Sequence, residues 1–235
     1  MNDRKVHALI PAAGSSVRFG GTTLKQYAHL LGMPVMSHSI SALQRHEAVG
    51  SVTVALAEDD GIFEELIRPR FPDVLTVVGG ESRAQSVMNG IHFITAEFPD
   101  CEWVLVHDAA RPCLSSSDLN RLLVQGLESE SGAILAVPVN DTLKLADDEG
   151  RIERTVDRTW FWAAQTPQLF PLGPLRVNLE AALASGSPPT DEASAMERAG
   201  AHPMLVMGSS TNIKITGTED LALAEFILQR QSVRE

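Results

Sequence analysis

Five short apolar runs, separated by segments of helical spacing, constrain the fold of this chain more than any other feature. They lie at 6–11, 51–57, 74–78, 103–107 and 133–137. Strands that are buried on both faces read as continuous apolar runs, as in parallel sheets covered by helices. The pattern predicts a three-layer, Rossmann-like α/β fold with a mostly parallel sheet between two layers of helices.

Helical signals fill the segments between these runs. Apolar spacing predicts helices at 35–45, 61–70, 193–199 and 219–229. Ser82 and Ser115 mark two further helix starts, because each is followed three residues later by a polar side chain, as in a capping box. The length of 235 residues fits one domain over 1–235.

One stretch at about 139–160 departs from the α/β rhythm. Two strand-like segments, 142–145 and 151–156, flank the acidic turn 147–150 and predict a protruding β-hairpin arm. An isolated two-stranded hairpin is only marginally stable in water. The arm must therefore pack on something, either on its own domain or on a second subunit.

Charge and composition exclude several functional classes. The formal net charge is −11, with no basic stripe, which argues against nucleic-acid binding. No apolar run approaches the roughly 20 residues that cross a bilayer. The first residues lack the pattern of a signal peptide, and the two cysteines lack metal-ligand spacing. We expect a cytoplasmic protein without a membrane partner.

The turn after the first apolar run is rich in small residues. It reads Pro-Ala-Ala-Gly-Ser-Ser-Val-Arg-Phe-Gly-Gly over 11–21, and ligands bind at the carboxyl ends of parallel strands. Such a turn exposes backbone N–H groups to phosphate oxygens. Ser16 and Phe19 replace the glycines of the dinucleotide pattern, while Arg18 and Lys25 add positive charge. The turn predicts a phosphate site.

Two further groups of residues follow predicted strands. Asp108 and Arg111 come after the run 103–107, where a carboxylate can hold Mg²⁺ together with substrate phosphates. The alternative is a local Asp–Arg pair that caps a turn. Gly79 and Gly80 precede the helix capped by Ser82, where glycine permits close approach of a ligand. A plain loop is the alternative there.

In this order, the motifs resemble the 2-C-methyl-D-erythritol 4-phosphate cytidylyltransferases of the non-mevalonate isoprenoid pathway, over nearly the whole chain. The resemblance implies the fold of the nucleotide-diphospho-sugar transferases and a homodimer joined by the arm. The matching segments are Ala12-Ala13-Gly14 with Arg18, Lys25-Gln26-Tyr27, Gly80 with Arg83 and Ser86, His107 to Pro112, Asp141-Thr142, Thr155 to Arg158, Gln165 to Gln168, Thr190 to Ala195 and Asn212-Ile213-Lys214.

The resemblance also implies a role for each site residue. Cytosine and ribose would lie among Ala12, Ala13, Gly14, Gly80, Glu81 and Ser86. Arg18, Lys25 and Mg²⁺ would neutralise the triphosphate of CTP, with Asp108 positioning the metal. Arg18, Lys25 and Lys214 would be the catalytic cations. The acceptor, methylerythritol phosphate, would contact Arg111, Thr166, Thr190, Asp191 and Lys214, together with Thr142 and Arg158 from the neighbouring subunit.

The implied reaction is transfer of CMP from CTP to the acceptor phosphate, which yields 4-diphosphocytidyl-2-C-methyl-D-erythritol and pyrophosphate. Two alternatives stay open from the sequence. A ribitol 5-phosphate cytidylyltransferase would share the nucleotide motifs and differ at the acceptor pocket. A dinucleotide-binding oxidoreductase would use Glu58 or Asp59 as the acid that binds ribose. The first turn lacks the glycines of the dinucleotide pattern, which argues against this alternative.

Overall fold

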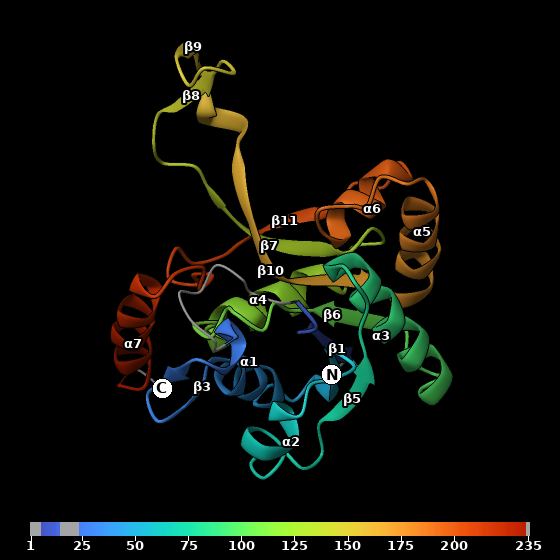
Figure 1. Ribbon diagram of the computed structural model, residues 1–235. Coiled ribbons are helices and arrows are strands. Elements are labelled where there is room, and N and C mark those ends of the chain that lie inside the picture. The colour runs from blue at the N-terminus through green and yellow to red at the C-terminus, as the bar shows by residue number, and fades with distance from the viewer. Residues whose placement is uncertain (1–5, 15–23, 234–235) are drawn as a thin grey trace.

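A seven-stranded sheet forms the centre of the protein, which we describe from a computed structural model for residues 6–14 and 24–233 (Figure 1). The strand order is β11-β7-β10-β6-β1-β4-β5. The strands are β1 (Val6–Pro11), β4 (Val49–Leu56), β5 (Leu75–Val78), β6 (Trp103–Val106), β7 (Ala133–Pro138), β10 (Trp162–Pro171) and β11 (Met204–Met207).

Six of these strands share one direction, and β10 alone runs against them. β1 pairs in parallel with β4 and β6, so that Leu9 lies beside Thr53 on one side and Val106 on the other. β10 is antiparallel to both β6 and β7, while β11 returns to the parallel arrangement beside β7. The prediction of a mostly parallel sheet is confirmed. The opposing strand lies in the middle of the sheet.

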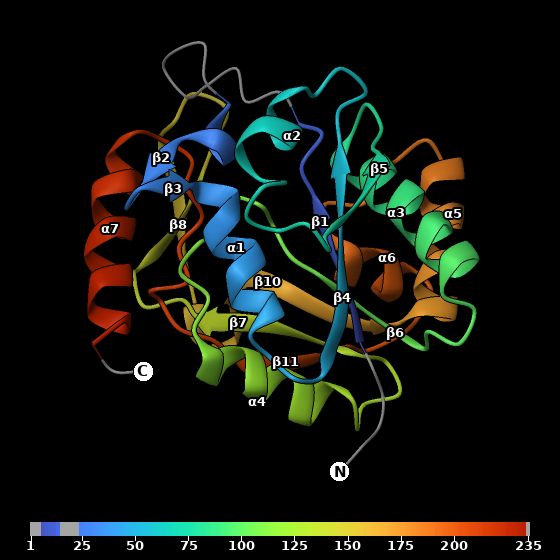
Figure 2. The ribbon, with the colours of Figure 1, turned by 90° about the horizontal axis from the view of Figure 1, so that it is seen from below.

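Helices cover both faces of the sheet and make the three predicted layers (Figure 2). Successive residues of β1 point to opposite faces: Ala8 and Ile10 pack towards α1, α2 and α4, whereas Leu9 packs towards α3, α5 and α6. These helices are α1 (Val35–Gln44), α2 (Ile62–Leu66), α3 (Arg83–Glu97), α4 (Ser116–Gly126), α5 (Leu172–Ala184) and α6 (Glu192–Arg198).

The last helix forms a separate apolar cluster beside the sheet. α7 (Glu219–Gln231) buries Ala224 and Ile227 against Leu30 of the short hairpin β2 (His29–Leu30) and β3 (Met33–Pro34), and against Cys113. Both predicted capping serines are confirmed, because Ser82 and Ser115 each accept a hydrogen bond from the backbone N–H three residues later. No helix in the described ranges is long and apolar enough to cross a membrane.

Three segments differ from the sequence predictions. Strand β10 and helix α5 were not predicted, and α2 ends at Leu66 rather than near Arg70. Pro69 lies just beyond α2, and a proline disfavours helical geometry at the residue before it. The segment at 212–216, which carries Lys214, is a loop.

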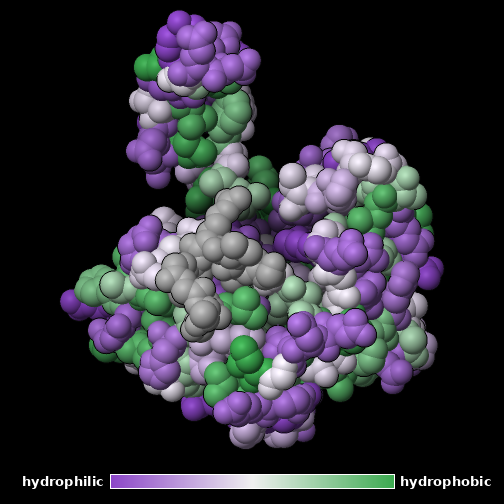
Figure 3. Space-filling view, viewed as in Figure 1, coloured by the Kyte–Doolittle hydropathy of each residue, from purple (hydrophilic) through white to green (hydrophobic). Residues whose placement is uncertain are grey.

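The predicted arm is a hairpin that stands away from the body (Figures 1 and 3). Among the described strands, β8 (Leu143–Ala146) and β9 (Ile152–Val156) pair only with each other, with Leu143 opposite Val156. Asp147 closes the turn by accepting from the backbone N–H groups of Glu149 and Arg151. The hairpin is confirmed, and in the part of the chain that the structure describes it stands apart from the sheet.

Candidate active site

A pocket of about 160 Å³ opens where β1, β5 and β6 end, at the carboxyl edge of the sheet. Residues from the first turn, the start of α3 and two loops meet there. Its lining consists of Pro11, Ala12, Ala13, Gly14, Lys25, Gln26, Glu81, Ser82, Arg83, Ser86, Asp108, Ala109, Ala110 and Lys214. This is the edge where an open parallel sheet binds ligands.

Asp108 is the centre of the charges in this pocket. Its Oδ1 accepts from Nε of Arg83 at 3.1 Å, and its Oδ2 lies 2.8 Å from Nζ of Lys214 and 3.7 Å from Nε of Arg111. Burial alone would raise the pKa of this carboxyl group, but Arg83 and Lys214 outweigh burial and hold it far below its usual range. Asp108 is therefore a carboxylate at neutral pH, surrounded by three cations.

The backbone of Asp108 is fixed by a buried polar pair beneath it. Its N–H donates to Oγ1 of Thr166 at 3.0 Å, and that hydroxyl lies 3.1 Å from Nδ1 of His107. His107 Nε2 donates to the carbonyl oxygen of Arg111 at 3.0 Å, so Nδ1 is the acceptor of a neutral ring. Burial lowers the pKa of His107 to about 4, which keeps the ring neutral.

Lys214 reaches the pocket from a loop that the sequence separates widely from Asp108. Asn212 is fully buried and donates from Nδ2 to the carbonyl oxygen of Thr166 at 2.8 Å. The carbonyl oxygen of Asn212 accepts from Nη1 of Arg111 at 2.7 Å, and the N–H of Ile215 donates to Ala110. These contacts hold the loop against β10 and the Asp108 segment on either side of Lys214.

Lys25 lies in a single 3₁₀ turn, Lys25–Tyr27, and lines the same pocket. The neighbouring Gln26 is buried and donates from Nε2 to the carbonyl oxygen of Ala12 at 3.0 Å, which ties this turn to the end of β1. Burial and the nearby charge of Lys214 lower the pKa of Lys25, while Asp108 acts in the opposite direction. Arg18, the other predicted cation of this region, lies outside the described residues.

In the nucleotide half of the predicted site, the backbone segments around Ala13 and Gly79 approach each other closely. A Cβ atom on Gly79 would lie 2.5 Å from Cβ of Ala13 and 2.9 Å from Oγ of Ser86, so only glycine fits there. Ser86 Oγ accepts from the N–H of Gly80 at 3.0 Å and lies 2.9 Å from the carbonyl oxygen of Ser82. The two glycines therefore have a packing reason beyond that of a plain loop.

The structure brings together part of the predicted set. Besides the residues above, Glu81 lines the pocket, and Gly80 and Arg111 contact its lining. Thr166 lies beneath Asp108. Thr190 is exposed before α6, and Asp191 caps that helix and accepts from Gln168. Thr142 and Arg158 are exposed on the arm and do not line the pocket of their own chain.

Glu192 and Gln168 help to organise the pocket, although the sequence predicted no role for either. Glu192, 1% exposed, binds the guanidinium of Arg83, and Gln168 accepts from the N–H of Ala193 at 3.0 Å. Both residues stand in motifs that matched the family. An acidic residue in the first turn of a helix is typical of capping, so its burial could not be read from the sequence.

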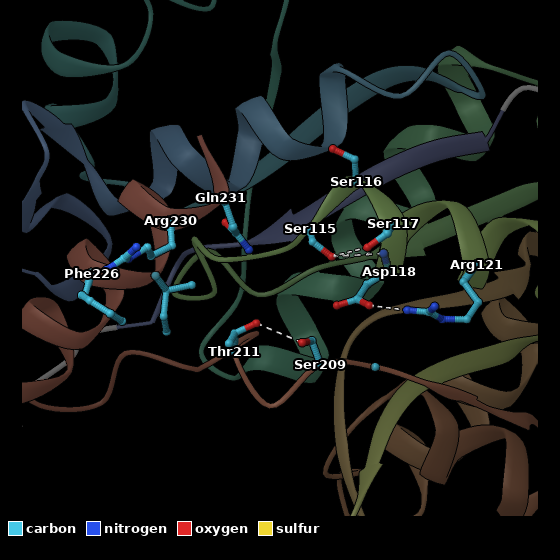
Figure 4. A pocket seen from close by; sticks show the side chains of 12 residues that line it. Ser115, Ser116, Ser117, Asp118, Arg121, Ser209, Thr211, Phe226, Arg230 and Gln231 are labelled. Atoms are coloured by element: carbon cyan, nitrogen blue, oxygen red, sulfur yellow. Dashed lines mark hydrogen bonds and ion pairs between the residues drawn. The ribbon is translucent and has the colours of Figure 1, made fainter. Parts of the chain in front are cut away.

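A larger hollow, of about 800 Å³, lies elsewhere, between the start of α4 and helix α7 (Figure 4). None of the predicted site residues that the structure describes lines it. Among the described residues, its charged groups are Arg230 and a single pair, Asp118 and Arg121, which come from one helix. Volume alone would select this hollow, but the convergence of charge from several elements selects the pocket at Asp108.

This sheet edge is suited to bind a triphosphate and a second phosphate. It combines a turn of small residues, closely packed glycines, and lysine and arginine side chains from several elements. The seven-stranded fold and this site define an enzyme of the nucleotidyltransferase class.

Comparison with known proteins narrows this class. The family model described as "2-C-methyl-D-erythritol 4-phosphate cytidylyltransferase" matches residues 6–230. Relatives with that name include one from Tolumonas auensis, 46% identical and aligned over 96% of this chain and 97% of the relative. Another, from Shewanella amazonensis, is 48% identical over 95% of this chain and 93% of the relative. The chain belongs to this family.

Solved structures agree with this assignment. The structure of a 4-diphosphocytidyl-2C-methyl-D-erythritol synthase superposes with a TM-score of 0.84 at 40% identity, covering 96% of this chain and 99% of the other. The cytidylyltransferase from Thermus thermophilus superposes with a TM-score of 0.80 at 30% identity, with the same coverage. The family and these structures confirm the predicted fold and the resemblance.

Proposed function

We propose that the chain transfers the CMP group of CTP to 2-C-methyl-D-erythritol 4-phosphate, releasing pyrophosphate, in isoprenoid precursor biosynthesis. The observation that carries this proposal is the convergence of Lys25, Lys214, Arg83 and Arg111 on the pocket around Asp108, in a chain of this family. Two phosphorylated substrates bring several negative charges to one place. A cluster of cations from separate elements is suited to bind them.

The reaction requires little proton chemistry from the protein. A phosphate oxygen of the acceptor attacks the α-phosphorus of CTP, a new P–O bond forms, and the bond to the β-phosphate breaks to release pyrophosphate. The attacking phosphate is ionised near neutral pH because its second pKa is about 6. Lys25 and Lys214 would hold the phosphates in line and stabilise the charge that develops. We assign no proton transfer to His107, because both of its ring nitrogens are engaged by Arg111 and Thr166.

We propose that the reaction uses a magnesium ion held mainly by the substrate. Within residues 6–14 and 24–233, no group of three or more His, Cys, Asp or Glu side chains could hold a metal. Mg²⁺ commonly takes one or two carboxylates and completes its octahedron with phosphates and water. Asp108 would be that carboxylate, and the ion would neutralise part of the triphosphate charge when bound.

We also propose that two copies associate through the arm. β8 and β9 pair with no other strand of the described chain, and Ile152 (66% exposed) and Trp160 (85% exposed) leave apolar surface open on the arm. Apolar residues gather on the arm below its hydrophilic tip (Figure 3). A second copy would cover this surface and bring Thr142 and Arg158 to the partner's pocket. Sedimentation velocity should show a dimer, and a monomer at micromolar concentration would contradict the proposal.

The decisive test compares two acceptors. Pyrophosphate release from CTP is measured with methylerythritol phosphate and with ribitol 5-phosphate, each with Mg²⁺ and with excess EDTA. We expect rapid release with methylerythritol phosphate and Mg²⁺, and no release with EDTA. Release with ribitol 5-phosphate should be at least about 100-fold slower, because a site that matches the hydroxyls of one acceptor rejects another. A preference for ribitol 5-phosphate would overturn the assignment of the acceptor, and full activity in EDTA would overturn the role of the metal.

A further inference from the structure

Glu192 is a buried acid that the reaction described above leaves unused. It is the first residue of α6, its side chain is 1% exposed, and it does not line the pocket. Both of its carboxylate oxygens contact one partner: Arg83 Nη1 at 2.7 Å and Arg83 Nη2 at 3.0 Å. A buried carboxylate with this fork-to-fork geometry fixes the plane of the guanidinium group that it binds.

Arg83 connects Glu192 to the centre of the pocket. Its two terminal nitrogens face Glu192, and its remaining nitrogen, Nε, donates to Asp108 Oδ1 at 3.1 Å. All three nitrogens of the guanidinium group therefore contact carboxylates on two sides. Because the group is planar and rigid, the position of Glu192 determines where Nε points.

The chain of contacts continues through Asp108 to the acceptor side. With Oδ1 held by Arg83, Oδ2 is directed to Nζ of Lys214 at 2.8 Å. We infer that Glu192 is a positioning residue for nucleotidyl transfer: through Arg83 it orients Asp108, and Asp108 places the ammonium group of Lys214. The inference rests on the proposed function, since it assigns Lys214 to the phosphates of the reaction.

Hydrogen bonds around the start of α6 fix the position of Glu192. Asp191 and Ser194 form a capping box at the start of α6, and the N–H of Ala193 donates to Gln168 Oε1 at 3.0 Å. Gln168 also donates to Asp191 at 2.8 Å. The first turn of α6 is thus fastened to β10, which also carries the Thr166 beneath Asp108.

Removal of the charge of Glu192 should redirect Arg83. With Glu192 neutral, Asp108 becomes the single carboxylate that Arg83 contacts, and a two-pronged contact between them is favoured. Asp108 would then turn towards Arg83 and away from Lys214. The consequence falls on the alignment of the phosphates rather than on the binding of the nucleotide base.

The test compares Glu192→Gln with Glu197→Gln, a matched change at an exposed position of the same helix. We expect kcat to fall about 10- to 100-fold in Glu192→Gln, as for a misplacement of reacting groups by a fraction of an ångström, while the KM for CTP changes less than about threefold. Glu197→Gln should match the wild type. Glu192→Asp keeps the negative charge but moves it away from Arg83, because the side chain is shorter. Its kcat should therefore lie between those of Glu192→Gln and the wild type.

A double variant separates positioning from general damage. If Glu192 acts through Asp108, then Asp108→Asn with Glu192→Gln should be about as slow as Asp108→Asn alone, because the pathway is already broken. If the fold-losses in kcat of the two single variants multiply in the double variant, the inference is overturned. A wild-type kcat in folded Glu192→Gln or folded Glu192→Asp would also overturn it. A wild-type protein that releases no pyrophosphate from CTP and methylerythritol phosphate would instead refute the proposed function. If Glu192→Gln does not fold, Glu192→Asp provides the same comparison.

Discussion

Two buried carboxylates, Asp108 and Asp118, lie ten residues apart and have opposite surroundings. Asp108 faces cations from α3, from its own loop and from the distant loop of Lys214. Asp118 pairs with Arg121 of its own helix at 2.6 Å, and its Oδ2 has no hydrogen-bond partner among the described residues. The hollow beside Asp118 is the larger of the two.

The difference between these regions concerns how charge is assembled. A pair within one helix forms whenever that helix forms, so it says little about a ligand. Cations that meet from separate elements repel one another, and Lys214 lowers the pKa of Lys25 for this reason, in addition to the larger effect of burial. Such repulsion costs stability and is retained where anions bind. Each of the following predictions tests this contrast, from the largest expected effect to the smallest.

The replacement Lys25→Ala should have the largest effect. It removes a cation that we assign to the triphosphate, and loss of one donor to a developing charge lowers kcat by about 100- to 1,000-fold. Steady-state kinetics with CTP and methylerythritol phosphate would measure the loss, and the circular-dichroism spectrum should stay unchanged. Near-normal turnover in the folded variant would remove Lys25 from the catalytic set.

The replacement Lys214→Ala should have a smaller effect, on the acceptor side. Loss of a charged hydrogen bond of roughly 1.5–3 kcal/mol predicts a fall in kcat/KM for the acceptor of about 10- to 100-fold. The Kd for CTP, measured by calorimetry without acceptor, should change much less. A variant that loses CTP affinity and keeps acceptor affinity would place Lys214 in the wrong half of the site.

Arg158→Ala tests whether the arm belongs to a catalytic site at all. We expect the KM for the acceptor to rise about tenfold with kcat little changed, since one guanidinium contact to phosphate is lost. At acceptor concentrations well below the KM of this variant, mixing it with Lys25→Ala should raise activity above the sum of the two separate samples, because a mixed dimer contains one site with both residues intact. No gain on mixing would show that Arg158 does not act on the partner's site.

The replacement Asp118→Asn should have the smallest effect. It neutralises a carboxylate of similar burial to Asp108, yet we expect kcat and both KM values within about twofold of wild type, as for a position away from the chemistry. The melting temperature of the same samples verifies folding. A tenfold loss of activity would mean that the larger hollow takes part in catalysis, and the contrast between the two carboxylates would fail.

Much of the fold follows from local sequence patterns. The strands β1, β4, β5, β6 and β7 are continuous apolar runs, and both capping serines and the arm were predicted from short signals. β10 was missed because its buried centre is Gln-Thr-Pro-Gln, which has neither apolar continuity nor alternation. α5 was missed because Gly173 and Pro174 read as breakers, although proline is tolerated in the first turn of a helix.

For the site, as for the fold, local motifs could be predicted from the sequence and contacts between distant residues could not. Residues on contiguous motifs, such as Ala12, Gly14 and Asp108, line one pocket, and their roles toward the nucleotide stay predictions. The connection from Glu192 through Arg83 to Asp108 joins residues 109 and 25 positions apart in the sequence, and no local pattern encodes such a contact. Thr142 and Arg158 stay predictions, because their place depends on a second copy.

The exposure of Trp160 has a spectroscopic consequence. The chain has three tryptophans: Trp103 is buried in the core, Trp162 is half-buried at the base of the arm, and Trp160 is 85% exposed. An indole in water emits at longer wavelength than one in an apolar contact. The red edge of the native emission spectrum therefore belongs mainly to one side chain, and its position during dilution would record directly whether the arm is covered.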